Sequence, residues 1–179
     1  MDTTMDNNPV NYIFQKKNYN SYQCGAYAIY NALLCNAIQT GIKHNIKLKY
    51  LIKKCKAQKG IGKLVSNFNS TLESVNNVMN INIKQVEATL ANIKRAFTTD
   101  RVVGACAHLI VFHWSQDVHK GNHYALIDKI YYKYGSYTYR VINYSFDKPV
   151  KIISERELKS MLMPYKDEHF QLPQLWCAI

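Results

Sequence analysis

The stretch CGAYAIYNALLCNAI, residues 24–38, predicts the clearest helix of the chain. Ala, Leu and other helix-compatible residues dominate it, and Thr40 and Gly41 follow as a plausible stop. Apolar residues recur at four-residue steps along it, at Ile29, Leu33 and Ala37. We therefore expect at least one broad face to be buried. A cysteine, Cys24, opens this helix.

The rest of the chain divides into a helical first half and a strand-rich second half. Further helices are predicted over residues 46–57, 71–79, 84–97 and 154–163. Strands are predicted over residues 12–14, 102–114, 124–130 and 137–144, with a hairpin turn at 133–136 and a C-terminal segment, 175–179, docked on the core. This order is typical of an α+β fold. A chain of 179 residues suits one domain, 1–179, with 1–10 as a flexible lead-in.

The composition of the chain limits its possible cellular location and the cofactors that it could bind. No run approaches the roughly 20 apolar residues of a membrane span, and the first residues do not form a secretory signal. The five cysteines are far apart and form no compact ligand cluster. We therefore expect free thiols, no metal or other cofactor, and an intracellular, cytoplasmic protein, in a host cytoplasm or a virion if the source is viral.

The net charge of +11 would suit an anionic partner bound through a basic surface. The lysines are scattered, however, and Lys, Asn, Ile and Tyr are all plentiful, as in proteins encoded by AT-rich genomes. The charge has two explanations, a functional basic face and a coding bias. The tightest cluster, Lys43 to Lys63, is expected on the solvent side of a helix.

Cys24 has the position that nucleophilic chemistry favours. The positive end of a helix lowers the pKa of a thiol, and the unsatisfied N–H groups of the first turn can bind an oxyanion. Gly25 is expected to leave room for substrate. The alternative is that Cys24 is only a small residue at a helix start.

A thiolate needs an imidazole base that is held by a third group. His123 leads the strand HYALID, and Asn143 lies near the same end of the paired strand, opposite residue 125 if the turn is centred near 134. A small register shift or bulge would bring Asn143 beside His123. Asp147 is a rival orienting residue.

Simpler roles exist for the same residues. His123 could be a strand-edge histidine, and Asn143 could be a turn former. His119 and His123 are four positions apart and would share a metal if the segment were helical. A loop and the lack of a carboxylate cluster argue against such a site.

CGAYAIYNAL, GNHYALIDKI and YRVINYS together resemble the papain-like cysteine peptidases, above all the bacteriocin-processing, double-glycine type, over about residues 15 to 147. The resemblance implies a papain-like fold, with Cys24 as nucleophile, His123 as base and Asn143 as orienting residue. Members usually carry a glutamine six residues before the cysteine as an oxyanion donor. Asn18 stands there, with Gln15 and Gln23 as alternative donors.

We therefore expect a cysteine peptidase that cleaves a peptide or isopeptide bond of a polypeptide substrate. One alternative is a peptidoglycan amidase or endopeptidase of the CHAP type. A second is a catalytically inactive papain-fold module, either a basic binding protein or a virion structural protein. Four tyrosines flank the candidate site and either line a groove or pack: Tyr22, Tyr27, Tyr124 and Tyr144.

Overall fold

The computed structural model describes residues 10–15, 23–55, 64–79, 83–97, 105–111, 121–145, 147–162 and 174–178. The elements in chain order are α1 (Cys24–Thr40), α2 (Leu48–Lys54), α3 (Leu64–Met79), β1 (Ile83–Val86), α4 (Leu90–Ala96), β2 (Ala105–Val111), β3 (Gly121–Lys133), β4 (Ser136–Ile142), β5 (Val150–Ser154), α5 (Glu155–Met161) and β6 (Gln174–Ala178). The strands form one antiparallel sheet in the order β1-β6-β2-β3-β4-β5. This confirms the predicted α+β class.

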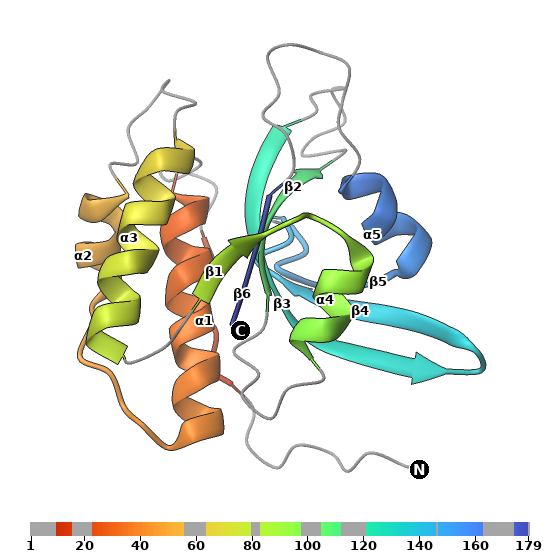
Figure 1. The fold of residues 1–179 in the computed structure, drawn as a ribbon, viewed down its shortest axis with the longest axis horizontal. Coiled ribbons are helices and arrows are strands. Elements are labelled where there is room, and N and C mark those ends of the chain that lie inside the picture. Colours follow the sequence, from red (N-terminus) through yellow and green to blue (C-terminus); the bar gives the residue numbers. More distant parts are fainter. Residues whose placement is uncertain are drawn as a thin grey trace.

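Helices cover both faces of the sheet (Figure 1). One core lies between the sheet and α1 to α3, and it contains Tyr124, Leu126 and Trp176 from the strands. The other lies between the sheet and α4 and α5, and it contains Ala125 and Ile127. Alternate residues of β3 therefore serve opposite cores, as strand geometry requires.

Helix α1 confirms the clearest sequence prediction and ends where Gly41 adopts a left-handed conformation, with φ of 71°. The predicted strand at residues 12–14 is wrong. Instead of a neighbouring strand, the buried side-chain amide of Asn31 pairs with the main chain of Ile13, donating to its O and accepting from its N, both at 3.0 Å. A single amide thus replaces a strand partner for this segment.

The helix predicted over residues 84–97 is also wrong in its first part. Residues 83–86 form β1, which pairs with β6, and α4 begins only at Leu90. The side chain of Thr89 caps α4 by accepting from the N–H of Asn92 at 3.2 Å. The periodicity of residues 84–97 reflects neighbouring residues only, whereas β1 depends on a strand near the C-terminus.

Two other elements extend the predictions. The helix predicted at 71–79 is the second half of α3, and the segment expected to dock on the core is the inner strand β6, between β1 and β2. Trp176 of β6 donates from Nε1 to Oδ1 of Asn69 at 2.7 Å. The cap predicted at Ser154 is confirmed, because its side chain accepts from the N–H of Glu157 at 3.1 Å and α5 follows.

The β3–β4 hairpin fixes the register near the candidate site. Its turn is Tyr134 and Gly135, both with positive φ, as two-residue hairpins prefer. The pairing shifts by one residue between Ile127 and Lys129, so Asp128 is bulged. Beyond the bulge Ile127 pairs with Val141 and Leu126 with Ile142, and β4 ends there, one residue before Asn143.

Within the described ranges, no helix is both long and apolar enough to cross a membrane.

Candidate functional site

Cys24 is the first residue of α1, with its helix start against α3 and β3. Gln23 precedes it as the N-cap residue but makes no side-chain cap. A Cβ on Gly25 would lie 3.0 Å from the ring of Phe68 and 3.6 Å from that of Tyr124. The expected room for substrate at Gly25 is therefore wrong, because two stacked aromatic rings fill it. Glycine avoids a tight contact with Phe68 here and so lets α1 pack closely against α3.

The thiol of Cys24 is shielded, since the residue is 4% exposed. Burial raises the pKa of the Cys24 thiol, and hydrogen bonds from the main chain of Tyr124, Gly25 and Cys24 itself partly oppose this. The sulfur therefore meets β3 at the residue directly after His123. The sequence predicts an accessible thiol with a lowered pKa. In the structure the thiol is desolvated and its pKa is raised, so it is neutral at pH 7.

His123 is 2% exposed and lies near the start of β3, directly before Tyr124. Its Nε2 lies 2.5 Å from the main-chain O of Asn143. A carbonyl only accepts, so this contact requires the proton on Nε2 and makes Nδ1 the basic nitrogen of the neutral ring. The structure thus brings the predicted base and orienting residue together, but through the backbone of Asn143.

The side chain of Asn143 has a different partner. Its Oδ1 accepts from the main-chain N–H of Gln15 at 3.3 Å. Asn143 has φ of 61°, the left-handed conformation that asparagine tolerates better than most residues. This conformation turns its carbonyl towards His123 while its side chain reaches the N-terminal segment.

The predicted oxyanion donor Asn18 lies outside the described residues. Both alternatives are described and carry buried amide atoms. Among the described residues, nothing hydrogen-bonds Nε2 or Oε1 of Gln15, or Oε1 of Gln23. Gln15 is 4% exposed and joined to Asn143, whereas Gln23 adjoins Cys24. Buried amides without partners are costly, so either is poised to bind a polar group that enters the site.

The other predicted site residues do not take part in the contact between His123 and Asn143. Asp147 is exposed in the loop after β4, whereas the imidazole contacts Asn143. Tyr124 and Tyr144 pack in the two cores, Tyr27 is buried, and Tyr22 lies outside the described residues. His119 is also outside them, and the described part of the chain holds no group of three or more residues suited to a metal.

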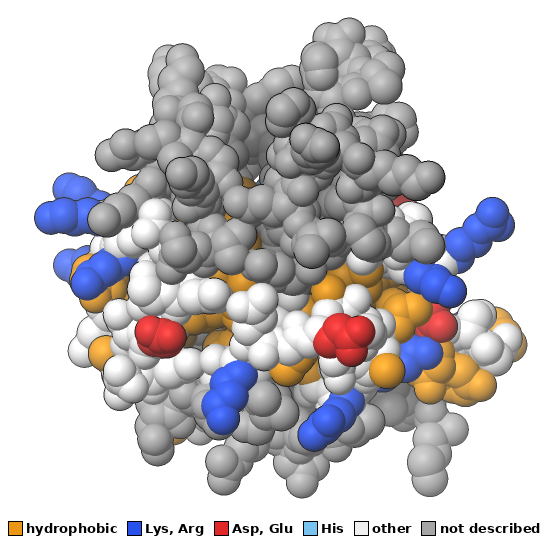
Figure 2. All heavy atoms as spheres, turned by 45° about the horizontal axis from the view of Figure 1, so that its top comes forward, with side chains coloured by type: hydrophobic (Ala, Val, Ile, Leu, Met, Phe, Trp, Pro, Cys, Tyr) orange, Lys and Arg blue, Asp and Glu red, His pale blue; other side chains and the backbone are white. Residues whose placement is uncertain are grey.

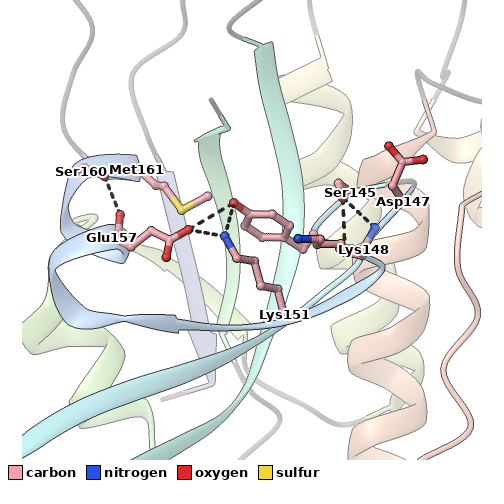
Figure 3. A pocket seen from close by; sticks show the side chains of 8 residues that line it. Ser145, Asp147, Lys148, Lys151, Glu157, Ser160 and Met161 are labelled. Atoms are coloured by element: carbon pink, nitrogen blue, oxygen red, sulfur yellow. Dashed lines mark hydrogen bonds and ion pairs between the residues drawn. The ribbon is translucent and has the colours of Figure 1, made fainter. Parts of the chain in front are cut away.

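A cavity of about 390 Å³ is lined by the loop after β4, by Lys151 of β5 and by α5 (Figure 3). On one wall Lys151 lies 2.6 Å from Glu157 and donates to the hydroxyl of Tyr144 at 3.1 Å. Asp147 and Lys148 line it as well. Because acidic and basic side chains both line the cavity, it can accommodate groups of either charge.

The buried pair of Asp128 and Arg140 was not predicted from the sequence. The Asp128 side chain is 1% exposed and accepts from Nε of Arg140 at 2.8 Å. The sequence did contain a signal for this pair. Asp128 and Arg140 lie in the predicted strands 124–130 and 137–144, which carry no other charged residue apart from Lys129. A buried carboxylate requires a partner, and the opposite strand of the hairpin offers one.

The buried thiols predict a loss of stability at alkaline pH. Burial raises the pKa of Cys35 and Cys55 to about 11 and of Cys177 to about 12. The unfolded chain releases these protons above about pH 8.5, so stability is complete below that pH and falls as pH rises towards 11. We expect urea titrations to give a loss of about 1.4 kcal/mol per pH unit for each thiol. Cys35→Ala should flatten this slope, and an unchanged slope would contradict the assignment.

The described lysine and arginine side chains do not form a continuous basic patch on the face in Figure 2. On the face in Figure 2, described lysine and arginine side chains stand apart, with apolar, uncharged and acidic groups between them. The exposed lysines of α2, Lys49, Lys53 and Lys54, confirm that this part of the lysine cluster faces solvent.

No protein-family model matches the chain, and no curated protein matches it in sequence. The structure is similar to the peptidase domain of ComA from Streptococcus, a bifunctional ABC transporter involved in a quorum sensing pathway. The TM-score is 0.51 and the identity 11%, over 92% of this chain and 96% of that chain. The resemblance predicted from the sequence is thereby confirmed at the level of the fold, and the chain has the papain-like fold of a peptidase domain.

Proposed function

We propose that the protein is a cysteine peptidase that cleaves a peptide or isopeptide bond with Cys24 as nucleophile and His123 as base. One observation carries the proposal. Helix α1 begins at Cys24 against the main chain of Tyr124, directly after a buried histidine whose ring is held by Asn143. The fold is that of a peptidase domain, which supports this reading of the two residues.

In the proposed reaction Nδ1 of His123 takes the thiol proton as sulfur attacks the substrate carbonyl carbon. The oxyanion that forms accepts hydrogen bonds from the N–H of Cys24 and from a side-chain amide, for which Gln15, Gln23 and Asn18 are the candidates. His123 then protonates the leaving amine as the C–N bond breaks. Water, deprotonated by His123, releases the acid from the thioester and restores the thiol.

The raised pKa of Cys24 determines how the attack begins. A desolvated thiol favours its neutral form, so in the proposed reaction the proton passes to His123 as the sulfur attacks. The leaving amine departs on the side of His123 and Asn143. The cavity lined by Tyr144, the residue after Asn143, is the proposed space for the substrate residue beyond the scissile bond, of polar or charged character (Figure 3).

A cleavage assay tests the proposal. The chain is incubated with a peptide library and, separately, with purified peptidoglycan, and new termini are identified by mass spectrometry. We expect peptide cleavage that Cys24→Ala lowers by about 10³-fold or more. Cys55→Ala is the matched control, because Cys55 is also buried and sits outside the proposed reaction.

Each other outcome contradicts the proposal in a different way. Digestion of peptidoglycan alone would favour the amidase alternative. Peptide cleavage that survives Cys24→Ala would exclude Cys24 as the nucleophile. No cleavage of either material would favour the inactive binding or structural module.

A further inference from the structure

We infer that Tyr12 and Asp128 are positioning residues for His123. They fix the N-terminal strap, defined as residues 10–15, so that Gln15 holds Asn143 and Asn143 holds the imidazole. The catalytic consequence rests on the proposed function, whereas the positioning itself can be measured without it.

The strap is anchored first at the bulge of β3. The hydroxyl of Tyr12 donates to Oδ2 of Asp128 at 2.6 Å. Asp128 is fixed in turn by Arg140, through Nε at 2.8 Å from Oδ1 and through Nη2 on Oδ2. The bulge makes this geometry possible, because Asp128 is the extra residue of the ladder. A hydrogen bond to a buried, paired carboxylate is among the strong ones.

A second anchor follows one residue later. Asn31 of α1 binds both main-chain polar groups of Ile13, and the side chains of Tyr12 and Phe14 pack against the core beneath α1. The strap is therefore held at consecutive residues by β3 and by α1. Because α1 begins at Cys24, the same strap connects the helix of the candidate nucleophile with the strand of the candidate base.

Gln15, the last residue of the strap, contacts the site itself. The N–H of Gln15 donates to Oδ1 of Asn143, and the carbonyl of Asn143 contacts Nε2 of His123. Asn143 has a positive φ, which costs free energy and persists where contacts enforce it. The bond from Gln15 is such a contact. Releasing the strap should therefore let Asn143 relax and the imidazole lose its acceptor.

The first test measures the hydrogen bonding of the His123 imidazole directly. Tyr12→Phe removes one oxygen and leaves the ring that packs on the core. In ¹⁵N spectra of the histidine side chains, we expect the His123 Nε2 resonance of this variant to lose the shift of a hydrogen-bonded N–H. Tyr132→Phe is the matched control, since Tyr132 is a tyrosine of β3 that is 64% exposed. Thermal unfolding checks that both variants stay folded.

The second test reads the thiol through its rate of alkylation by iodoacetamide. Tyr12→Phe should slow the alkylation of Cys24 by about threefold to tenfold if misplacement of the base is modest. Tyr132→Phe is again the matched control and should keep the wild-type rate of alkylation.

The outcomes separate the two proposals. A folded Tyr12→Phe variant with the His123 spectrum of Tyr132→Phe would overturn the strap inference, whatever the thiol does. Equal alkylation of Cys24 and the other thiols in the wild type would contradict the peptidase function. A shifted His123 resonance in Tyr12→Phe would support the strap inference even then.

Discussion

Asn143→Ala is expected to slow peptide cleavage by about a hundredfold, whereas Asn143→Gly should stay within about tenfold of the wild type. The reason is that His123 contacts the main-chain carbonyl of Asn143, which every residue possesses. Alanine is disfavoured at a φ of 61°, so the carbonyl should turn away. Glycine adopts this φ freely and keeps the carbonyl in place.

The Gly variant still loses the contact between Oδ1 and Gln15, which accounts for its smaller defect. Initial rates on the same peptide substrates provide the comparison, with circular dichroism to check folding. Asn143→Asp serves as a further control, because it keeps an oxygen acceptor and tolerates positive φ. If glycine proves as damaging as alanine, the side chain and not the carbonyl orients His123.

The second large effect concerns stability. Asp128→Ala is expected to lower the free energy of unfolding by about 3 kcal/mol, because it leaves Arg140 without its buried partner. It also removes the acceptor of the Tyr12 hydroxyl. The matched control is Glu157→Ala, which breaks an ion pair with Lys151 whose side chains are 31% and 37% exposed, and which should cost about 1 kcal/mol or less.

Urea denaturation measures both variants. The double variant Asp128→Leu with Arg140→Met should recover much of the loss, since apolar residues can replace a buried ion pair without leaving an unpaired charge. Equal losses for Asp128→Ala and Glu157→Ala would show that the buried pair contributes no more than an exposed one, and the strap would lack its main anchor.

Local patterns allowed α1 and the β3–β4 hairpin to be predicted from the sequence. The helix stop at Gly41 and the turn at Gly135 depend on neighbouring residues, so the local sequence is enough to predict them. The predicted turn placed Asn143 opposite residue 125, and the observed pairs reach Leu126 with Ile142, one residue short of it. Strands β1 and β6 could not be predicted in this way, because each becomes a strand only by pairing with residues far along the chain.

For the candidate site, the sequence predicted the proximity of His123 and Asn143 but not the atoms through which they meet. Residue type and spacing pointed to His123 and Asn143, and these two are in contact. The backbone contact depends on a single positive φ, which the sequence indicates only through the turn-forming tendency of asparagine. The burial of Cys24 depends on how Phe68 and Tyr124 stack beside Gly25, which no local pattern reveals.

Site-resolved labelling tests most directly whether Cys24 and His123 act together. The four described thiols whose exposure is known, Cys24, Cys35, Cys55 and Cys177, are between 2% and 4% exposed, so access alone should not favour one of them. The folded protein is treated with a limiting amount of iodoacetamide, and the modified cysteines are mapped by mass spectrometry. The account predicts that Cys24 is modified first in the wild type and that His123→Ala abolishes this preference. Modification of the cysteines without preference, or a preference for Cys24 that survives His123→Ala, would contradict it.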